Sequence, residues 1–338
     1  MQTNRPLLTI AIPTYKRSSL LCELLAVLAP QLAGHSEVEL IISDNASPDN
    51  TSQVVQQFID AGLSVRYHRH PENIGSDANF ISCFHMAAGK YFWLCGDDDI
   101  ITPGSLDQVM GHLSGQEYDL IYATSYGFQH DWRSKRQQDP LGRRFHTIMD
   151  ARHFAKVVNI MFTFISGIIV NKQRLEATPH EDPSAFLNTN LTQLSWTLPL
   201  LRCHRRSLVL WNRPVAARMA NTGGYAIGSV FGEKLTAVTA RCLPDRPDLA
   251  DCITDFAIRR WFPSIIFEIR SSRNQSLHIE QAHIDLNRSY GRNFRYWVFA
   301  YPVLKLPLPI ARVWFRGGEA ISKIIYVLSI PGFWRKQT

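Results

Sequence analysis

The apolar residues in the first part of the chain fall into short continuous runs, separated by segments whose apolar residues have helical spacing. The runs that predict buried strands are Leu7–Pro13, Val38–Ser43, Ser64–His68, Tyr91–Cys95 and Asp119–Thr124. After the first run, leucines at positions 20, 21, 24, 25 and 28 share one face of a helix. Alternating strands and helices are typical of a mainly parallel sheet covered by helices, so the pattern predicts an α/β fold.

The later part of the chain follows a different pattern. A further buried strand is predicted over Phe162–Val170, and beyond about Tyr225 the alternation gives way to a mostly helical pattern. Among the connections, Ser47 followed by Pro48 is typical of a helix cap and its first residue. We therefore expect two parts, residues 1–225 and 226–338.

Three consecutive aspartates, Asp97, Asp98 and Asp99, follow the predicted strand Tyr91–Cys95. Open α/β sheets bind ligands at the carboxyl ends of their strands. Adjacent carboxylates repel one another, and Mg²⁺ or Mn²⁺ offsets this by binding one or two carboxylates together with substrate phosphates. The run therefore predicts a divalent metal and diphosphate site. The alternative is a solvated acidic turn before the next helix.

The formal net charge of +7 is concentrated near the C-terminal end. Between Tyr290 and Thr338 there are eight Lys or Arg residues against one acid, Glu319. The stretch is also rich in aromatic residues, and prolines such as Pro302 and Pro307 argue against a spanning helix. Aromatic and basic residues together suit the headgroup region of an anionic membrane surface. We expect peripheral membrane association; alternatively, the aromatic residues pack onto the rest of the protein.

The six cysteines are scattered, without a CxxC pair or a zinc-type His spacing, which is typical of a reducing compartment. The N-terminal segment contains too short an apolar stretch for a signal peptide and leads directly into the first predicted strand. The sequence thus predicts a cytoplasmic protein, peripherally associated with the inner face of the cell membrane.

Four segments within about the first hundred residues carry a family resemblance: AIPTYKR (Ala11–Arg17), SDNASPDNT (Ser43–Thr51), ENIGSDANF (Glu72–Phe80) and GDDD (Gly96–Asp99). In this order they resemble the signatures of the family 2 glycosyltransferases of the GT-A fold. Within the family, the chain is similar to O-antigen transferases of the abequosyltransferase type. The resemblance implies a Rossmann-like catalytic domain over 1–225 and a helical, basic and aromatic extension over 226–338.

The resemblance also implies which residues bind the nucleotide sugar: Pro13, Thr14, Tyr15, Arg17, Asp44, Asn73, Asp97 and Asp98. Arg17 can pair with phosphate, and Asp44 can accept a hydrogen bond from a base N–H or a ribose hydroxyl. The metal would be held by Asp97 and Asp99. Because the family pattern is Asp-x-Asp, three consecutive aspartates leave open which two bind it.

The chemistry implied by the resemblance is inverting transfer. A base removes the proton of the acceptor hydroxyl, the oxygen attacks the anomeric carbon, and the metal stabilises the departing nucleoside diphosphate. The family's base often lies in a Glu-Asp pair after a strand, and Glu181-Asp182 follows the strand predicted over Phe162–Val170. Asp182 followed by Pro183 is equally typical of a helix cap. Base and cap are therefore alternative roles for Asp182.

The chain contains neither a Gly-rich dinucleotide fingerprint nor a phosphate-loop Lys motif, which argues against a dehydrogenase or an NTPase. We expect a transferase that uses a nucleotide-sugar donor and a lipid-linked oligosaccharide or saccharide acceptor in bacterial O-antigen or capsule synthesis. We expect no nucleic acid partner. The alternatives are a nucleotidyltransferase acting on sugar phosphates and a nucleic-acid-binding protein that uses the basic tail. Asn221–Tyr225 (NTGGY) could form a lid or an ordinary loop.

Overall fold

The computed structural model describes residues 5–133, 142–219, 227–271 and 282–329. The chain divides into two compact units. The first unit comprises Met1–Met149 and Thr163–Asn221, and the second comprises Asp150–Phe162 and Thr222–Thr338. A short piece of the second unit therefore interrupts the first in the sequence.

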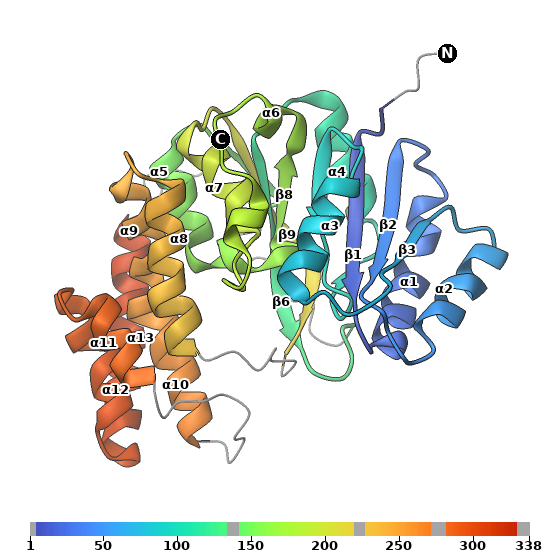
Figure 1. The fold of residues 1–338 in the computed structure, drawn as a ribbon. Coiled ribbons are helices and arrows are strands. Elements are labelled where there is room, and N and C mark those ends of the chain that lie inside the picture. Colours follow the sequence, from blue (N-terminus) through green and yellow to red (C-terminus); the bar gives the residue numbers. More distant parts are fainter. Residues whose placement is uncertain (1–4, 134–141, 220–226, 272–281, 330–338) are drawn as a thin grey trace. The chain divides into compact units, whose positions relative to one another are not determined.

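The first unit is built on a mixed sheet, in which the described residues form nine strands (Figure 1). These strands are β1 (Leu8–Thr14), β2 (Val38–Asp44), β3 (Arg66–Arg69), β4 (Tyr91–Leu94), β5 (Ile100–Ile101), β6 (Leu120–Phe128), β7 (Phe145–Ile148), β8 (Ile168–Asn171) and β9 (Ser207–Arg218). Their order is β3-β2-β1-β4-β8-β6-β9-β5, and β7 also pairs with β9. Strands β3, β2, β1 and β4 run parallel, whereas β8 is antiparallel to both β4 and β6. The carboxyl ends of β1, β2 and β4 consequently lie at one edge.

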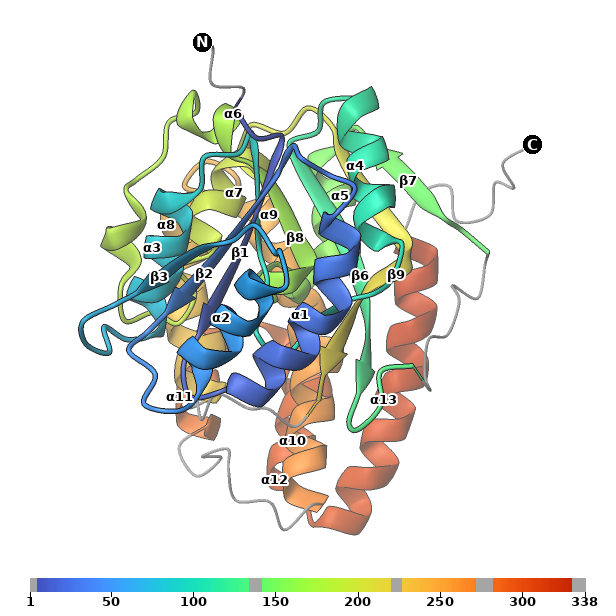
Figure 2. The same cartoon turned by 90° about the vertical axis from the view of Figure 1, so that its right-hand side faces the viewer.

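Helices cover both faces of this sheet (Figure 2). The described helices of the first unit are α1 (Ser18–Leu32), α2 (Thr51–Asp60), α3 (Ser76–Met86), α4 (Ser105–Gly115), η2 (Ile165–Gly167), α6 (Lys172–Glu176), η3 (Pro183–Phe186) and α7 (Leu194–Arg202). Buried leucines of α1 pack with alternate residues of β1, because successive strand side chains point to opposite faces. On the other face, Phe92 of β4 contacts Phe84 of α3 and Trp196 of α7, with ring centroids 5.4 and 5.9 Å away.

The second unit is helical throughout the residues that the structure describes. It contains α5 (Ala151–Val158), most of η1 (Asn159–Thr163), η4 (Ser229–Lys234), α8 (Leu235–Cys242), α9 (Pro247–Phe256), η5 (Ala257–Trp261), α10 (Phe262–Ser271), α11 (Ala282–Tyr290), η6 (Tyr296–Ala300), α12 (Tyr301–Lys305) and α13 (Leu308–Ser329). Helix α5 packs against α9, which joins the early piece of chain to this unit. Within the described ranges, no helix combines the length and apolar character that crossing a bilayer requires.

The predicted strands and helices of the first unit are confirmed with two corrections, whereas β5, β7 and β9 were not predicted. The strand predicted over Phe162–Val170 was wrong in its first half, where the chain forms η1 and η2, and only Ile168–Asn171 pairs in the sheet. An apolar run without alternation does not distinguish a buried strand from a buried short helix. Ser47 does not cap α2, which begins at Thr51, because its hydroxyl accepts a hydrogen bond from the Lys16 N–H (3.0 Å).

Candidate active site

The motif residues lie where the parallel strands β1, β2 and β4 end. At the ends of β1 and β2, Thr14 is paired with Asp44. The pairing of β4 with β1 continues to Cys95, whose N–H donates to the Ala11 carbonyl (2.9 Å) directly before the aspartate run. Open α/β sheets bind their ligands at this kind of edge. The edge therefore forms the candidate donor site.

Arg17 contacts two of the three aspartates. It occupies the N-cap position of α1, and its Nη1 lies 2.9 Å from Asp97 Oδ1 and 3.5 Å from Asp98 Oδ2. The side chain of Asp97 is only 4% exposed, whereas that of Arg17 is 36% exposed. Burial raises the pKa of Asp97 to about 6, although the Arg17 charge opposes this rise. The structure thus brings together a cation and carboxylates that lie about eighty residues apart in the sequence.

Asp99 is bonded to two later segments of the chain. Its Oδ2 accepts a hydrogen bond from the Ser166 hydroxyl (2.5 Å), and its Oδ1 accepts one from the Arg218 N–H (3.1 Å). The Ser166 hydroxyl oxygen in turn accepts a hydrogen bond from the Gly96 N–H (2.8 Å). Burial, followed by the charge of Asp98, raises the pKa of Asp99 to about 7. Asp99 therefore fixes the aspartate loop against η2 and β9.

Sequence reasoning did not identify Ser166 or Arg218. The only signal for Ser166 was a hydroxyl residue within the mostly apolar run FTFISGIIV, which also contains Thr163. Arg218 lies 119 residues after Asp99, and no local pattern indicates such a contact. Its guanidinium pairs with Glu23 and donates to the Asp98 carbonyl (3.4 Å). Ser166 and Arg218 can be identified as site residues only from the structure, which shows that η2 and β9 lie beside the aspartate loop.

The aspartate run has the hard oxygen ligands that Mg²⁺ and Mn²⁺ prefer. Among the described residues, however, no group of three or more His, Cys, Asp or Glu is arranged to hold a metal ion. Both carboxylate oxygens of Asp99 already accept protein hydrogen bonds, and Asp97 faces Arg17. Asp98 is the least buried of the three, with 16% of its side chain exposed. The residues therefore fit a cation held jointly by this run and by substrate phosphates, rather than one enclosed by protein ligands.

Asp44, predicted to contact the base or ribose, is fully buried and bonded within the protein. Its Oδ1 accepts a hydrogen bond from the Ser47 N–H (2.8 Å), and its Oδ2 accepts one from the Tyr67 hydroxyl (2.6 Å). Arg69 Nε lies 3.4 Å from Asp44 Oδ2. Burial and the bond to Asp44 raise the pKa of Tyr67 to about 12. In this structure Asp44 holds the ends of β2 and β3 together.

Tyr15 and Asn73 also lie at this edge. A hydrogen bond with Asn73 lowers the pKa of Tyr15. Asn73 Oδ1 accepts a hydrogen bond from Asn45 Nδ2 (2.9 Å), which links the segment after β2 to the segment after β3. Pro13 and Thr14 are the last two residues of β1 and are buried. The four motif segments thus meet at one end of the sheet.

The predicted base lies on a separate segment and has the contacts of a helix cap. Asp182 Oδ1 accepts hydrogen bonds from the N–H (2.8 Å) and the hydroxyl of Ser184, and Pro183 is the first residue of η3. These bonds lower the pKa of Asp182. Both Asp182 and Glu181 are exposed. The cap is therefore present, and the role of base stays a prediction. The segment Asn221–Tyr225 lies outside the described residues.

The sheet, its covering helices and the helical C-terminal region define the class of protein: an α/β fold of the GT-A glycosyltransferase type, as predicted. The structure of S. aureus TarS 1–349 in complex with UDP-GlcNAc aligns with a TM-score of 0.59 at 17% identity, over 94% of this chain and 91% of that chain. The complex of the same protein with UDP gives a TM-score of 0.58 at 16% identity, with the same coverage.

Residues 9–173 match the family Glycosyl transferase family 2, the family that the sequence motifs resemble. It is 29% identical over 181 residues to the abequosyltransferase RfbV of Salmonella typhimurium, covering 51% of this chain and 54% of that protein. It is 28% identical over 106 residues to the GalNAc(5)-diNAcBac-PP-undecaprenol β-1,3-glucosyltransferase of Campylobacter jejuni, covering 31% and 34%. The chain spans about half the length of the first of these relatives and about a third of the second.

Proposed function

We propose that the protein is an inverting glycosyltransferase that acts in bacterial cell-surface polysaccharide synthesis. It would move a sugar from a nucleotide-sugar donor to a lipid-linked oligosaccharide or saccharide acceptor. The observation that carries the proposal is the contact of Arg17 with Asp97 and Asp98 at the strand ends of a family 2 chain. The name of the Campylobacter relative supports the acceptor class, since it specifies an undecaprenol-linked acceptor.

In this proposal Arg17 binds the donor diphosphate. Its guanidinium is about one-third exposed and already lies in a cluster of charges, so a diphosphate can replace part of its contact with the aspartates. Tyr15 and Asn73 contact the nucleoside, and Pro13 and Thr14 form the buried wall beneath it. Asp44 acts indirectly, by fixing the strand ends through Tyr67.

Bound Mg²⁺ or Mn²⁺ would supply charge stabilisation for the departing diphosphate. Asp97 and Asp98 are better placed to hold it than Asp99, whose two oxygens bind Ser166 and the Arg218 backbone. Asp99 then keeps the loop in place while its neighbours face the ligand. This assignment refines the Asp97–Asp99 pair expected from the family pattern.

Asp182 is the proposed general base. Its lowered pKa keeps the carboxylate ionised at neutral pH, and its exposed position leaves it accessible to an acceptor hydroxyl. Glu181, the preceding residue, is the second candidate. We also propose that the protein works at the inner face of the cell membrane, bound there through its C-terminal region, where the basic and aromatic residues are concentrated.

A panel of nucleotide sugars, assayed for thermal stabilisation and donor hydrolysis with and without Mn²⁺, tests the function. One donor is expected to stabilise the protein, because a ligand that binds only the folded state raises its melting temperature. Arg17→Gln should lose that stabilisation. If no nucleotide sugar shifts the melting temperature while sugar phosphates and nucleoside triphosphates do, the protein is a nucleotidyltransferase instead.

A further inference from the structure

Helix α13 of the second unit presents an apolar stripe to solvent. Its residues are Ile310, Val313, Trp314, Ile321 and Ile324, and their exposed fractions range from 46% to 73%. They recur at intervals of three, four or seven residues, which places them on one face of the helix. Single exposed apolar residues are ordinary on a protein surface, but a continuous stripe of this kind marks an interaction site.

The other faces of α13 have different partners. Ala311 is buried, and Phe315 stacks on Phe267 of α10 with ring centroids 5.0 Å apart, so this face packs within the second unit. Arg312 and Arg316 are exposed between the packed face and the stripe. An exposed apolar face beside cations is the arrangement of helices that lie in the surface of an anionic bilayer. Charge complementarity therefore favours an anionic lipid surface as the occupant of the stripe.

The stripe continues onto η6. Trp314 Nε1 donates a hydrogen bond to the Val298 carbonyl (2.7 Å), which places the stripe beside Val298 and Trp297, both more than 40% exposed. Trp297 also lines a cavity of about 420 Å³, within the range of roughly 300–1,000 Å³ typical of ligand pockets. We call this cavity the α11–α12 pocket. The α11–α12 pocket thus lies next to the α13 stripe, the surface that would contact the bilayer.

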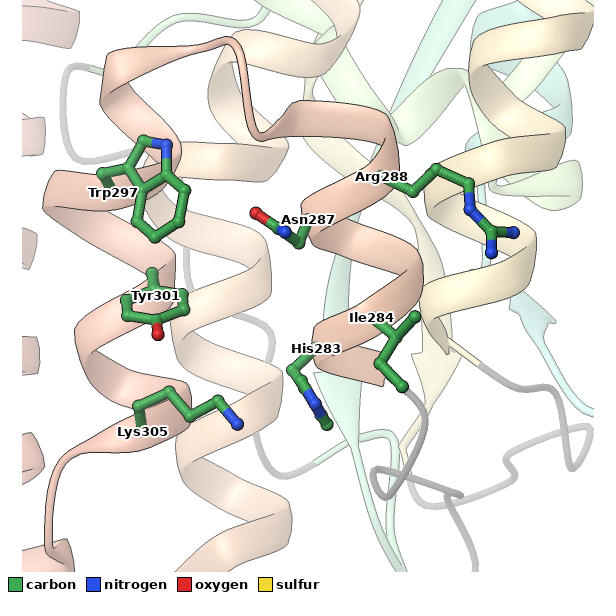
Figure 3. Close-up of a pocket in the computed structure, with 7 residues that line it drawn as sticks. All are labelled: His283, Ile284, Asn287, Arg288, Trp297, Tyr301 and Lys305. Carbon is green, nitrogen blue, oxygen red and sulfur yellow. The ribbon is translucent and has the colours of Figure 1, made fainter.

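The α11–α12 pocket combines cationic, polar and aromatic groups. Its lining includes His283 and Asn287 of α11, Trp297 of η6, and Tyr301 and Lys305 of α12. Figure 3 shows Lys305 directed from α12 toward α11, where His283 lies at the end of the helix. The rings of Trp297 and Tyr301 lie 4.6 Å apart and form the wall on the same side as Lys305.

Lys305 is the cation available to a ligand in this pocket. Arg288 also lines the pocket, but it points away from this space and pairs with Glu233 of η4. Throughout the described part of the chain, the Lys305 ammonium forms no ion pair. An ammonium with a hydroxyl, an imidazole and an amide nearby suits phosphate oxygens, which accept several hydrogen bonds.

We propose that the α11–α12 pocket binds the terminal phosphate of a lipid headgroup while the α13 stripe lies in the bilayer surface. The inference rests on the membrane association proposed above and adds a specific site to it. The pocket distinguishes a phosphate monoester from a diester, because only a terminal phosphate offers three oxygens to Lys305, Tyr301 and His283 together. Trp297 lies at the mouth with its ring partly exposed, as aromatic residues do at a membrane interface.

The test is vesicle co-sedimentation of the full chain. Vesicles of phosphatidylcholine containing phosphatidic acid are compared with vesicles containing phosphatidylglycerol, at compositions that give equal surface charge. The wild type is expected to bind phosphatidic acid at least about fivefold more tightly, a preference corresponding to about 1 kcal/mol. Lys305→Gln and Tyr301→Phe should each bring the ratio close to one. Arg316→Gln, the matched control, should weaken both kinds of binding by a similar factor of up to about fivefold.

The outcomes separate the proposals. A ratio that is the same in the wild type and in Lys305→Gln, with unchanged melting temperatures, overturns the pocket. If neither kind of vesicle binds, both the membrane association and the pocket fail. Donor stabilisation is measured separately, so the pocket and the glycosyltransferase function can fail independently.

Discussion

At the scale of single residues, the three carboxylates of the candidate site outnumber the Arg17 guanidinium that contacts two of them. Arg17 faces Asp97 and Asp98, while Asp99 lies behind them and is held by Ser166 and the Arg218 backbone. The three adjacent carboxylates therefore have different partners, and substitutions should separate ligand binding from loop stability.

We predict that two matched substitutions affect different properties, one the rate of transfer and the other the stability of the fold. Asp97→Asn should reduce transfer at least about a hundredfold, as expected for the loss of an electrostatic contact at the reacting phosphate, without lowering the melting temperature. Asp99→Asn should lower stability by about 1–3 kcal/mol, because an amide has only one acceptor end for two donors. Transfer assays and denaturant unfolding of both variants measure this. Equal stability losses in the two variants would contradict the division of roles.

The raised pKa values predict how stability depends on pH without divalent cations. Asp97 and Asp99 have folded-state pKa values of about 6 and about 7, above the ordinary value of 3.8. The folded protein therefore binds more protons than the unfolded chain, so this contribution is fully present below about pH 4 and is lost as the pH rises through 6 and 7. Denaturant unfolding in chelator should give a lower free energy at pH 8 than at pH 5.5.

The double variant Asp97→Asn/Asp99→Asn provides the control for this pH dependence, because neither amide titrates. Its unfolding free energy should change less between the two pH values than that of the wild type. A wild-type stability that rises from pH 5.5 to pH 8 would show that other groups dominate.

At the scale of elements, η3 carries the residue with two competing roles. Asp182 caps this short helix through the Ser184 N–H, and the same carboxylate is the proposed base. Asn caps helices about as well as Asp, whereas it cannot accept a proton at neutral pH.

We therefore expect Asp182→Asn to keep its melting temperature and donor binding but to lose transfer by at least about a hundredfold. Loss of a cap costs about 1 kcal/mol, so Asp182→Ala should in addition lower the melting temperature by a few degrees. Single-turnover transfer and thermal unfolding separate the two effects. Near-normal transfer by Asp182→Asn would assign Asp182 to capping alone and make Glu181 the next variant to assay.

The elements also show how far the sequence determines the fold. Strands β1, β2 and β4 were predictable because buried parallel strands are continuous apolar runs, and the aspartates followed from their position after one of them. Strand β8 was predicted too long, because the run FTFISGIIV is mostly apolar. Its apolar residues are buried both in the short helices and in the strand, so the sequence does not show where the strand begins. The contacts of Asp99 with Ser166 and Arg218 could not be predicted, since they depend on which distant strands become neighbours.

At the scale of the whole molecule, the exposed α13 stripe predicts how the protein partitions onto membranes. Val313→Gln/Ile324→Gln should reduce binding to anionic vesicles at least about tenfold, since each buried aliphatic side chain contributes about 1.5–3 kcal/mol. Met149→Gln, which alters another exposed apolar residue, should bind as the wild type does. Flotation assays at low and at physiological salt measure both. Unchanged partitioning of the double variant would show that the cations alone account for binding.

The order of the strands in the sheet determines when, during translation, each strand can pair with its neighbour. All four motifs have been synthesised once about the first hundred residues are translated, yet β4 then still lacks its neighbour β8, and the aspartate loop lacks Ser166 and Arg218. The second unit's piece Asp150–Phe162 is translated before the first unit is complete. The nascent chain thus carries all four motifs before the sheet that positions them is complete, and its apolar strand edges are exposed during that interval. The aspartate loop gains its contact with Arg218 only after the end of β9 has been translated.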